Sequence, residues 1–176
     1  MDPEIDPIPL FRQSSPRRFV MRNLASAGIF AVALITGTLV QAQTYEQSLA
    51  AVEQGNDRAA FTGFKKLAEQ GHTKSQFQLG MMYRNGLGVP EDDRQAVAWY
   101  RKAADKGDAN AQYNLGEIYR NDKGALKDEQ AAYFWLLLAS AQGHQNAARN
   151  RDFVARRLTP EKRAAVEAAA HKWHPS

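Results

Sequence analysis

The sequence predicts an all-α protein, an α-solenoid of tandem two-helix repeats preceded by a signal peptide. Two observations predict the solenoid. From residue 45 onward the chain is rich in alanine and other strong helix formers, whereas Val, Ile and Thr, which favour strands, are concentrated before it. The same residue pattern also returns at a spacing of 36, as Gly80 and Gly116 illustrate (116 − 80 = 36). A fixed period of this length is typical of stacked helical repeats.

The composition excludes several classes of function. The net charge is only +4 and the two signs are interspersed, which does not favour nucleic-acid binding. The chain has no cysteine, so disulfides, thiolate metal sites and cysteine nucleophiles are excluded. It also lacks a phosphate-binding glycine loop and a nucleophile elbow. We therefore expect no enzymatic activity, no cofactor and no metal site.

The N-terminal residues resemble an export signal. Residues 1–20 contain four prolines without a helical or strand period, which indicates a disordered lead or a start assigned too early. Residues 21–42 begin with Met21 and Arg22, continue with an apolar run and end on the small residues Val40 and Ala42. This pattern predicts a signal peptide cleaved after Ala42. The alternative is an uncleaved anchor in the inner membrane, although the run is short for a bilayer.

Residues that recur 36 positions apart are predicted to carry the repeat structure. The first copy predicts a helix over 75–84, a glycine-containing turn at 86–90 and a second helix over 93–105. Asp92 or Asp93 is expected to cap the second helix, and Gly107 to end it in the left-handed conformation. The repeat residues of the first copy are Leu79, Gly80, Tyr83, Gly88, Ala96, Trp99 and Gly107, and those of the second are Leu115, Gly116, Tyr119, Gly124, Ala132, Trp135 and Gly143.

Residues 75–107 resemble a full Sel-1-like repeat, a relative of the tetratricopeptide repeat, and residues 111–143 resemble a second copy. The second copy departs from the pattern in its turn, where Asp122 and Leu126 replace a glycine and a proline. The resemblance implies a right-handed superhelix. It divides residues 43–176 into a degenerate unit at 44–71, repeats at 75–110 and 111–146, and a C-terminal cap at 147–174.

A stripe on the first helices is the candidate partner-binding surface. Its members lie opposite the stripe expected to be buried, so they should face outward on the concave wall that first helices form in such solenoids. Aromatic, Met and Arg side chains are enriched in interface cores. The alternative is that Phe77, Tyr113 and Phe153 pack between neighbouring helices. The stripe comprises Phe77, Met81, Arg84, Tyr113, Glu117, Arg120, Arg149, Phe153 and Arg156.

The resemblance and the stripe together favour an exported scaffold, periplasmic or secreted, that binds a protein or peptide and regulates an envelope signalling or assembly process. Membrane contact is expected only through an uncleaved leader. The alternative is a cell-wall accessory that binds or hydrolyses carbohydrate. Glu117 is the one acidic residue of the stripe, whereas glycoside hydrolysis ordinarily needs a pair of carboxylates.

Overall fold

The computed structural model describes residues 44–121 and 127–176, and all of these are helices and their connections, without a strand. The chain divides into two units, residues 1–39 and 40–176, and every described residue belongs to the second. The predicted lead, the signal peptide and Gly124 therefore lie outside the described residues. None of the helices found in the described ranges has the length and apolar character needed to cross a membrane.

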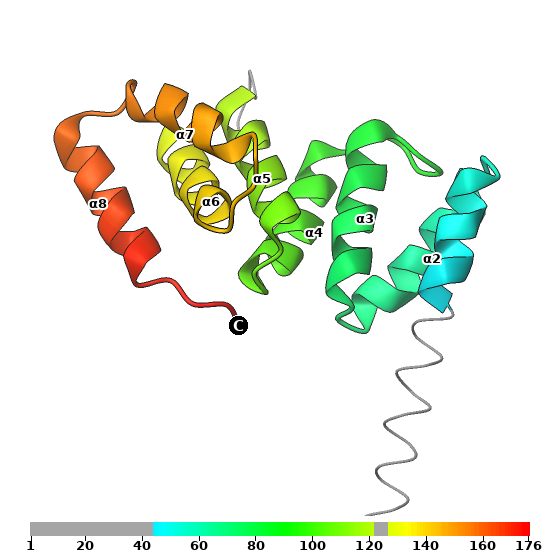
Figure 1. The fold of residues 1–176 in the computed structure, drawn as a ribbon. Helices are drawn as coiled ribbons and strands as arrows, with labels where there is room; N and C mark the ends of the chain where they lie inside the picture. The colour runs from blue at the N-terminus through cyan, green and yellow to red at the C-terminus, as the bar shows by residue number, and fades with distance from the viewer. Residues whose placement is uncertain (1–43, 122–126) are drawn as a thin grey trace, which may run out of the picture. The chain divides into compact units, whose positions relative to one another are not determined.

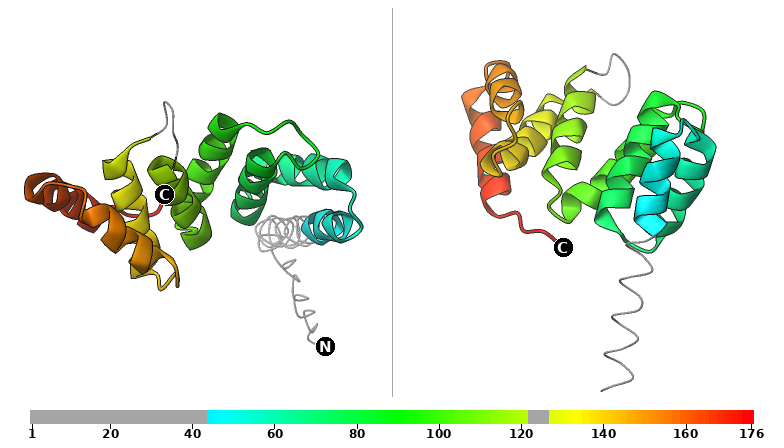
Figure 2. Two further views of the ribbon diagram at one scale, coloured as in Figure 1. Left: turned by 90° about the horizontal axis from the view of Figure 1, so that it is seen from above. Right: turned by 45° about the vertical axis from the view of Figure 1, so that its right-hand side comes forward.

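The helices follow one another in pairs, as Figures 1 and 2 show. An opening helical segment occupies residues 44–53. From α2 to α7 each helix packs on its neighbours in the chain, whereas α8 packs on α6. This layered arrangement is an α-solenoid. The labelled helices are α2 (Asp57–Glu69), α3 (Thr73–Asn85), α4 (Asp93–Asp105), α5 (Ala109–Asn121), α6 (Glu129–Ala141), α7 (Ala147–Ala155) and α8 (Pro160–His171).

The helix ends follow the expected capping chemistry. The Asp92 side chain accepts a hydrogen bond from the Gln95 amide at the start of α4, and Asp128 does the same for α6. Thr159 caps α8, with Pro160 at the first helical position. After α4, Gly107 has a φ of 89°, in the left-handed region that ends a helix without a Cβ clash. The expected cap at Asp92 and the expected left-handed conformation of Gly107 are thus confirmed.

Within each repeat the two helices approach closely at a glycine. A Cβ on Gly80 would lie 2.6 Å from a ring carbon of Tyr100, and a Cβ on Gly116 would lie 2.6 Å from Leu136 Cγ. Ala96 and Ala132 are fully buried on the facing helices. Of the other repeat residues, Leu79, Leu115, Trp99 and Trp135 are buried, and Tyr83 and Tyr119 are half-buried.

A buried glutamine connects α2 to α3, and another connects α4 to α5. Gln76 Nε2 donates to the carbonyl of Ala68, and Gln112 Nε2 donates to the carbonyl of Ala104. The Ala68 and Ala104 carbonyls also accept from the amides of Gly71 and Gly107, so each glutamine adds a second donor at the end of α2 or α4. The two glutamines are 36 residues apart (112 − 76 = 36), so this connection belongs to the repeat.

The C-terminal segment returns to the middle of the array. After α8, Trp173 packs against the core cluster that contains Tyr100, Ala104 and Trp135. The amide and hydroxyl of Ser176 both donate to the carbonyl of Asp105, at the end of α4. Figure 1 shows this tail running from α8 toward the connection between α4 and α5.

Candidate protein-binding face

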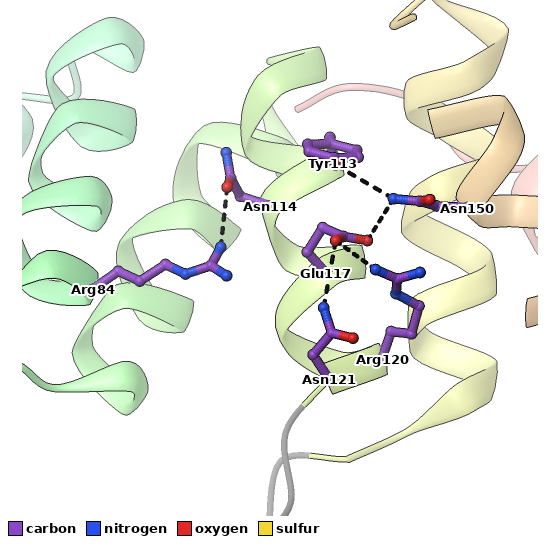
Figure 3. Close-up of polar contacts among 7 residues, drawn as sticks. All are labelled: Arg84, Tyr113, Asn114, Glu117, Arg120, Asn121 and Asn150. Atoms are coloured by element: carbon purple, nitrogen blue, oxygen red, sulfur yellow. Dashed lines mark hydrogen bonds and ion pairs between the residues drawn. The ribbon is translucent and has the colours of Figure 1, made fainter. Parts of the chain in front are cut away.

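Eight of the nine stripe residues lie on three helices, α3, α5 and α7, and Arg156 is the residue that follows the end of α7. We call the surface formed by these nine residues the first-helix face. Side chains bridge the three helices in succession, as Figure 3 shows. Arg84 of α3 bonds to Asn114 of α5, and Asn150 of α7 bonds to Tyr113 and Glu117 of α5. The structure thus places the three segments of the stripe beside one another.

The apolar residues of the stripe on α3 are more enclosed than the sequence indicates. Phe77 and Met81 are half-buried and pack against the core cluster of α4 and α5. The Phe77 ring centroid lies 5.8 Å from that of Tyr100. These contacts give the two side chains a packing role between helices, in place of the fully outward orientation expected.

Arg84 has polar partners but no charged one. Its Nη1 donates to Asn114 Oδ1 at 3.1 Å, and its side chain is half-buried. Burial raises the pKa of Tyr100 to about 12, and the adjacent Arg84 guanidinium opposes that rise. Within residues 44–121 and 127–176, no carboxylate forms an ion pair with Arg84. The first-helix face therefore contains a partly desolvated cation that lacks an anionic partner among the described residues.

Arg120, at the same position in the next repeat, has its counter-ion. Its Nη2 lies 2.7 Å from Glu117 Oε2, and both side chains are at most one-fifth exposed. Asn150 Nδ2 donates to Glu117 Oε1 at 2.8 Å. The repeat position of Glu117 is Met81, so α3 has no acid to pair with Arg84. Arg84 and Arg120 are therefore chemically different although the repeat aligns them.

The amides that organise this face were not in the predicted stripe. Gln78, Asn114 and Asn150 occur at intervals of 36 (114 − 78 and 150 − 114), and the last two orient Arg84 and Glu117. Their signal is present in the sequence as an amide residue that recurs one position after the first stripe residue of each helix, Phe77, Tyr113 and Arg149.

Tyr113 of the stripe is also partly committed to packing. Its ring stacks on the His144 imidazole, with centroids 4.3 Å apart and an interplanar angle of 19°. The face becomes more exposed toward α7, where Arg149, Phe153 and Arg156 are all exposed. The guanidinium carbon of Arg120 lies 5.7 Å from the Phe153 ring centroid. The face thus offers the half-buried guanidinium of Arg84, which has no ion pair among the described residues, together with an exposed aromatic ring and exposed arginines, a set suited to binding.

His72 has a local structural role that the sequence analysis did not identify. It precedes α3, and its Nδ1 accepts a hydrogen bond from the Ser75 amide, so it caps the helix as Asp108 caps α5. Partial burial lowers the pKa of His72, with smaller contributions from the charges of Lys74 and Lys106. The folded state therefore favours the neutral imidazole, because protonation would remove the acceptor and place a positive charge at a helix N-terminus.

The His72 cap predicts a loss of stability in mild acid. A folded pKa below the ordinary value leaves this contribution intact above about pH 6.5, the unperturbed pKa, and removes it as the pH falls through the folded pKa. His72→Asn keeps an acceptor that does not titrate. We expect the melting temperature of the wild type to fall further between pH 7.5 and 5 than that of His72→Asn. The additional loss in free energy of unfolding should be at most the contribution of one helix cap, about 1 kcal/mol.

Thermal unfolding monitored by circular dichroism measures this difference. His174→Asn is the matched control, because His174 is exposed near the end of the chain, and it should follow the wild type. Parallel pH profiles for the wild type and His72→Asn would contradict the capping role.

Comparisons with known proteins agree with this architecture. The family model described as "Sel1 repeat" matches residues 73–108 and 109–144. A search of curated proteins found no match. The crystal structure of a protective antigen of uropathogenic Escherichia coli, described as displaying an SLR fold, is similar with a TM-score of 0.70 and 28% identity over 76% of this chain. This chain spans 29% of that protein's length. A Sel1 repeat protein from Oxalobacter formigenes is similar with a TM-score of 0.59 and 29% identity, covering 71% of this chain and 97% of that one.

Proposed function

We propose that the first-helix face of this chain, which contains two Sel1 repeats, binds a protein or peptide through an acidic group placed at Arg84. The repeat family suggests a protein-interaction scaffold. The observation that carries the more specific proposal is Arg84, a half-buried guanidinium with no ion pair in the described residues. Desolvating such a cation has a cost that an incoming carboxylate offsets, and bidentate pairing adds specificity.

The neighbouring groups favour a ligand that brings its own acid. Asn114 orients the Arg84 guanidinium, and Glu117 is already paired with Arg120 and Asn150. Phe153, at 46% exposed, offers an apolar contact at the far end of the face. The one carboxylate of the stripe is already engaged, and glycoside hydrolysis ordinarily needs two carboxylates. The face is therefore better suited to binding an acidic peptide than to hydrolysing carbohydrate.

Replacing Arg84 is expected to weaken ligand binding without unfolding the protein. One charged hydrogen-bonded contact is worth about 1.5–3 kcal/mol, which corresponds to roughly a 10- to 150-fold loss of affinity. The experiment selects ligands from a random peptide library with wild-type bait and then measures their affinity for Arg84→Ala. We expect enriched peptides to contain Asp, Glu or a required terminal carboxylate. Arg84→Lys should recover only part of the affinity, because lysine keeps the charge but not the forked geometry.

Arg101→Ala is the matched control. Arg101 is an exposed arginine on α4, outside the first-helix face, and it pairs with Asp105. Its loss should leave the affinity unchanged, and circular dichroism should show equal helical content in all variants. Equal binding by Arg84→Ala and the wild type would overturn the assignment of the acidic contact to this face.

The proposal includes export of the scaffold to the periplasm or beyond, where it would regulate an envelope signalling or assembly process. Support for export comes from the order of charge, apolar run and small residues over 21–42. The intact mass of the protein recovered from an envelope fraction tests this part. A mass that begins at Gln43 supports cleavage and export, whereas a membrane-bound species that retains residues 21–42 favours the anchored alternative.

A further inference from the structure

The C-terminal tail, residues 173–176, occupies a defined position at the end of α4. The turn after α4 already uses the carbonyls of Ala103 and Ala104, which accept from the amides of residues 106–108. The Asp105 carbonyl instead accepts from the Ser176 amide at 2.8 Å and from the Ser176 hydroxyl at 3.2 Å. The tail thus supplies donors to a helix-terminal carbonyl that has no partner within the helix.

Two further contacts hold the tail in place. Pro175 Cγ lies 3.4 Å from the position that a Cβ on Gly107 would take. Trp173 is partly buried against the core cluster that includes Trp135 and Ala104. We call the surface formed by the Asp105 carbonyl, Gly107 and the adjoining part of this cluster the tail site.

The equivalent place one repeat earlier is filled differently. Gly71 corresponds to Gly107, and Lys106 Nζ lies 3.2 Å from the position of a Cβ on Gly71. Lys106 Nζ also donates to the Gly71 carbonyl at 2.6 Å. The Lys106 side chain, at the end of the next second helix, therefore covers the glycine that ends the degenerate unit, where no tail is needed.

The residue that corresponds to Lys106 explains why the tail site is open to the tail. It is Gln142 (106 + 36 = 142), and its Nε2 donates to Gln112 Oε1 at 2.8 Å instead of reaching Gly107. In the first repeat, where Lys106 reaches the glycine, the corresponding Gln76 Oε1 is buried without a partner among the described residues. The choice of Gln or Lys at this position thus decides which group is satisfied and whether the glycine is covered.

We propose that the tail site is a peptide-binding site for a C-terminal segment of the type Trp-x-Pro-Ser, occupied in cis by the chain's own tail. The site accepts the same sequence in trans, from a second copy of this chain or from a free peptide, once the resident tail is released. Trp173 is the anchor, Pro175 covers Gly107, and Ser176 donates to Asp105. The site lies at the end of a second helix and does not depend on Arg84.

The first arm of the test measures tail release in the full-length chain. NMR reports the exchange of the Ser176 amide proton with solvent, which the bond to Asp105 should slow. Trp173→Ala removes the anchor, and Gln142→Lys restores the lysine that would compete for Gly107. Each variant should accelerate Ser176 exchange by about tenfold or more, because local opening sets the exchange rate. His174→Ala, a change at an exposed neighbour in the tail, should exchange as the wild type does.

The second arm measures binding in trans. A synthetic peptide with the sequence of residues 171–176 and a free C-terminal carboxylate is titrated into each protein, and amide shifts of residues 105–108 are followed. Trp173→Ala should bind the peptide at concentrations at least about tenfold below those that the wild type requires, because its own tail no longer competes. A peptide with Ala in place of the Trp should not bind.

Unchanged Ser176 exchange in both folded variants would contradict the contact in cis. A folded Trp173→Ala that does not bind the peptide would contradict the proposed binding site. If Trp173→Ala loses α8, Ser176 exchange in Gln142→Lys decides alone, because a lysine at position 142 would compete with the free peptide as it does with the tail. Retained Ser176 protection in a folded Gln142→Lys then overturns the proposal.

Discussion

Replacing Trp135 with alanine is expected to lower the free energy of unfolding by about 3–5 kcal/mol, the usual range for removal of a buried tryptophan. Trp135 is 2% exposed and belongs to the core cluster shared by α4, α5 and α6. Its ring meets that of Phe134 edge to face at 5.0 Å. The neighbouring helices cannot collapse into the space without moving their own contacts, so the cavity should persist.

Chemical denaturation followed by circular dichroism measures this loss. Arg101→Ala is the comparison, because the Arg101 guanidinium carbon lies 4.8 Å from the Trp135 ring centroid while its side chain is largely exposed. Loss of that cation–π contact should cost about 0.5–1 kcal/mol. A cost below about 1 kcal/mol for Trp135→Ala would show that this ring does not contribute to the core as described.

Replacing Ala132 with leucine is expected to cost about 1–3 kcal/mol through overpacking. Ala132 is fully buried, and its carbonyl oxygen lies 3.3 Å from the position that a Cβ on Gly116 would occupy. Three additional carbons at this close approach would force α5 and α6 apart or displace neighbouring side chains from their rotamers.

The same substitution at an exposed alanine separates overpacking from the chemistry of leucine itself. Ala98 lies on α4 and is exposed, so Ala98→Leu should change the free energy of unfolding by less than about 0.5 kcal/mol. A midpoint unchanged by Ala132→Leu would contradict the close packing of the second repeat.

The local structure of the repeats could be predicted from the sequence because each element carries its own signal. Asp92 and Thr159 are good capping residues, and Gly107 follows a helical period that it then ends. The glycines at 80 and 116 recur together with the small residues opposite them. These signals concern neighbours along the chain or one period away, which are the contacts that a repeat protein mainly makes.

The partners of the arginines in the candidate site depend on residues that differ between the repeats. A repeat period predicts what the copies share and does not predict these differences. Arg84 and Arg120 align, yet they have different partners because Met81 becomes Glu117 and Tyr100 becomes Leu136 in the second copy. A leucine cannot approach an arginine as a tyrosine hydroxyl can, and a glutamate can neutralise one. The packing of Phe77 against Tyr100 could not be predicted either. The helical period indicates on which side of α3 a residue lies, but not which neighbouring helix covers that side.

The hydrogen bond between Ser176 and Asp105 joins residues 71 positions apart, and this affects the order in which the helices of the array should unfold. In an array whose units touch only their neighbours, the terminal units can fray independently from either end. Here Ser176 is bonded to Asp105 in the middle of the array, so α5, α6, α7 and α8 all lie inside a loop closed by their own chain. Loss of the C-terminal unit therefore requires the bond to Asp105 at the end of α4 to break as well, which couples these helices. Native-state hydrogen exchange should show α5 to α8 opening together, with independent fraying confined to the opening segment 44–53 and α2.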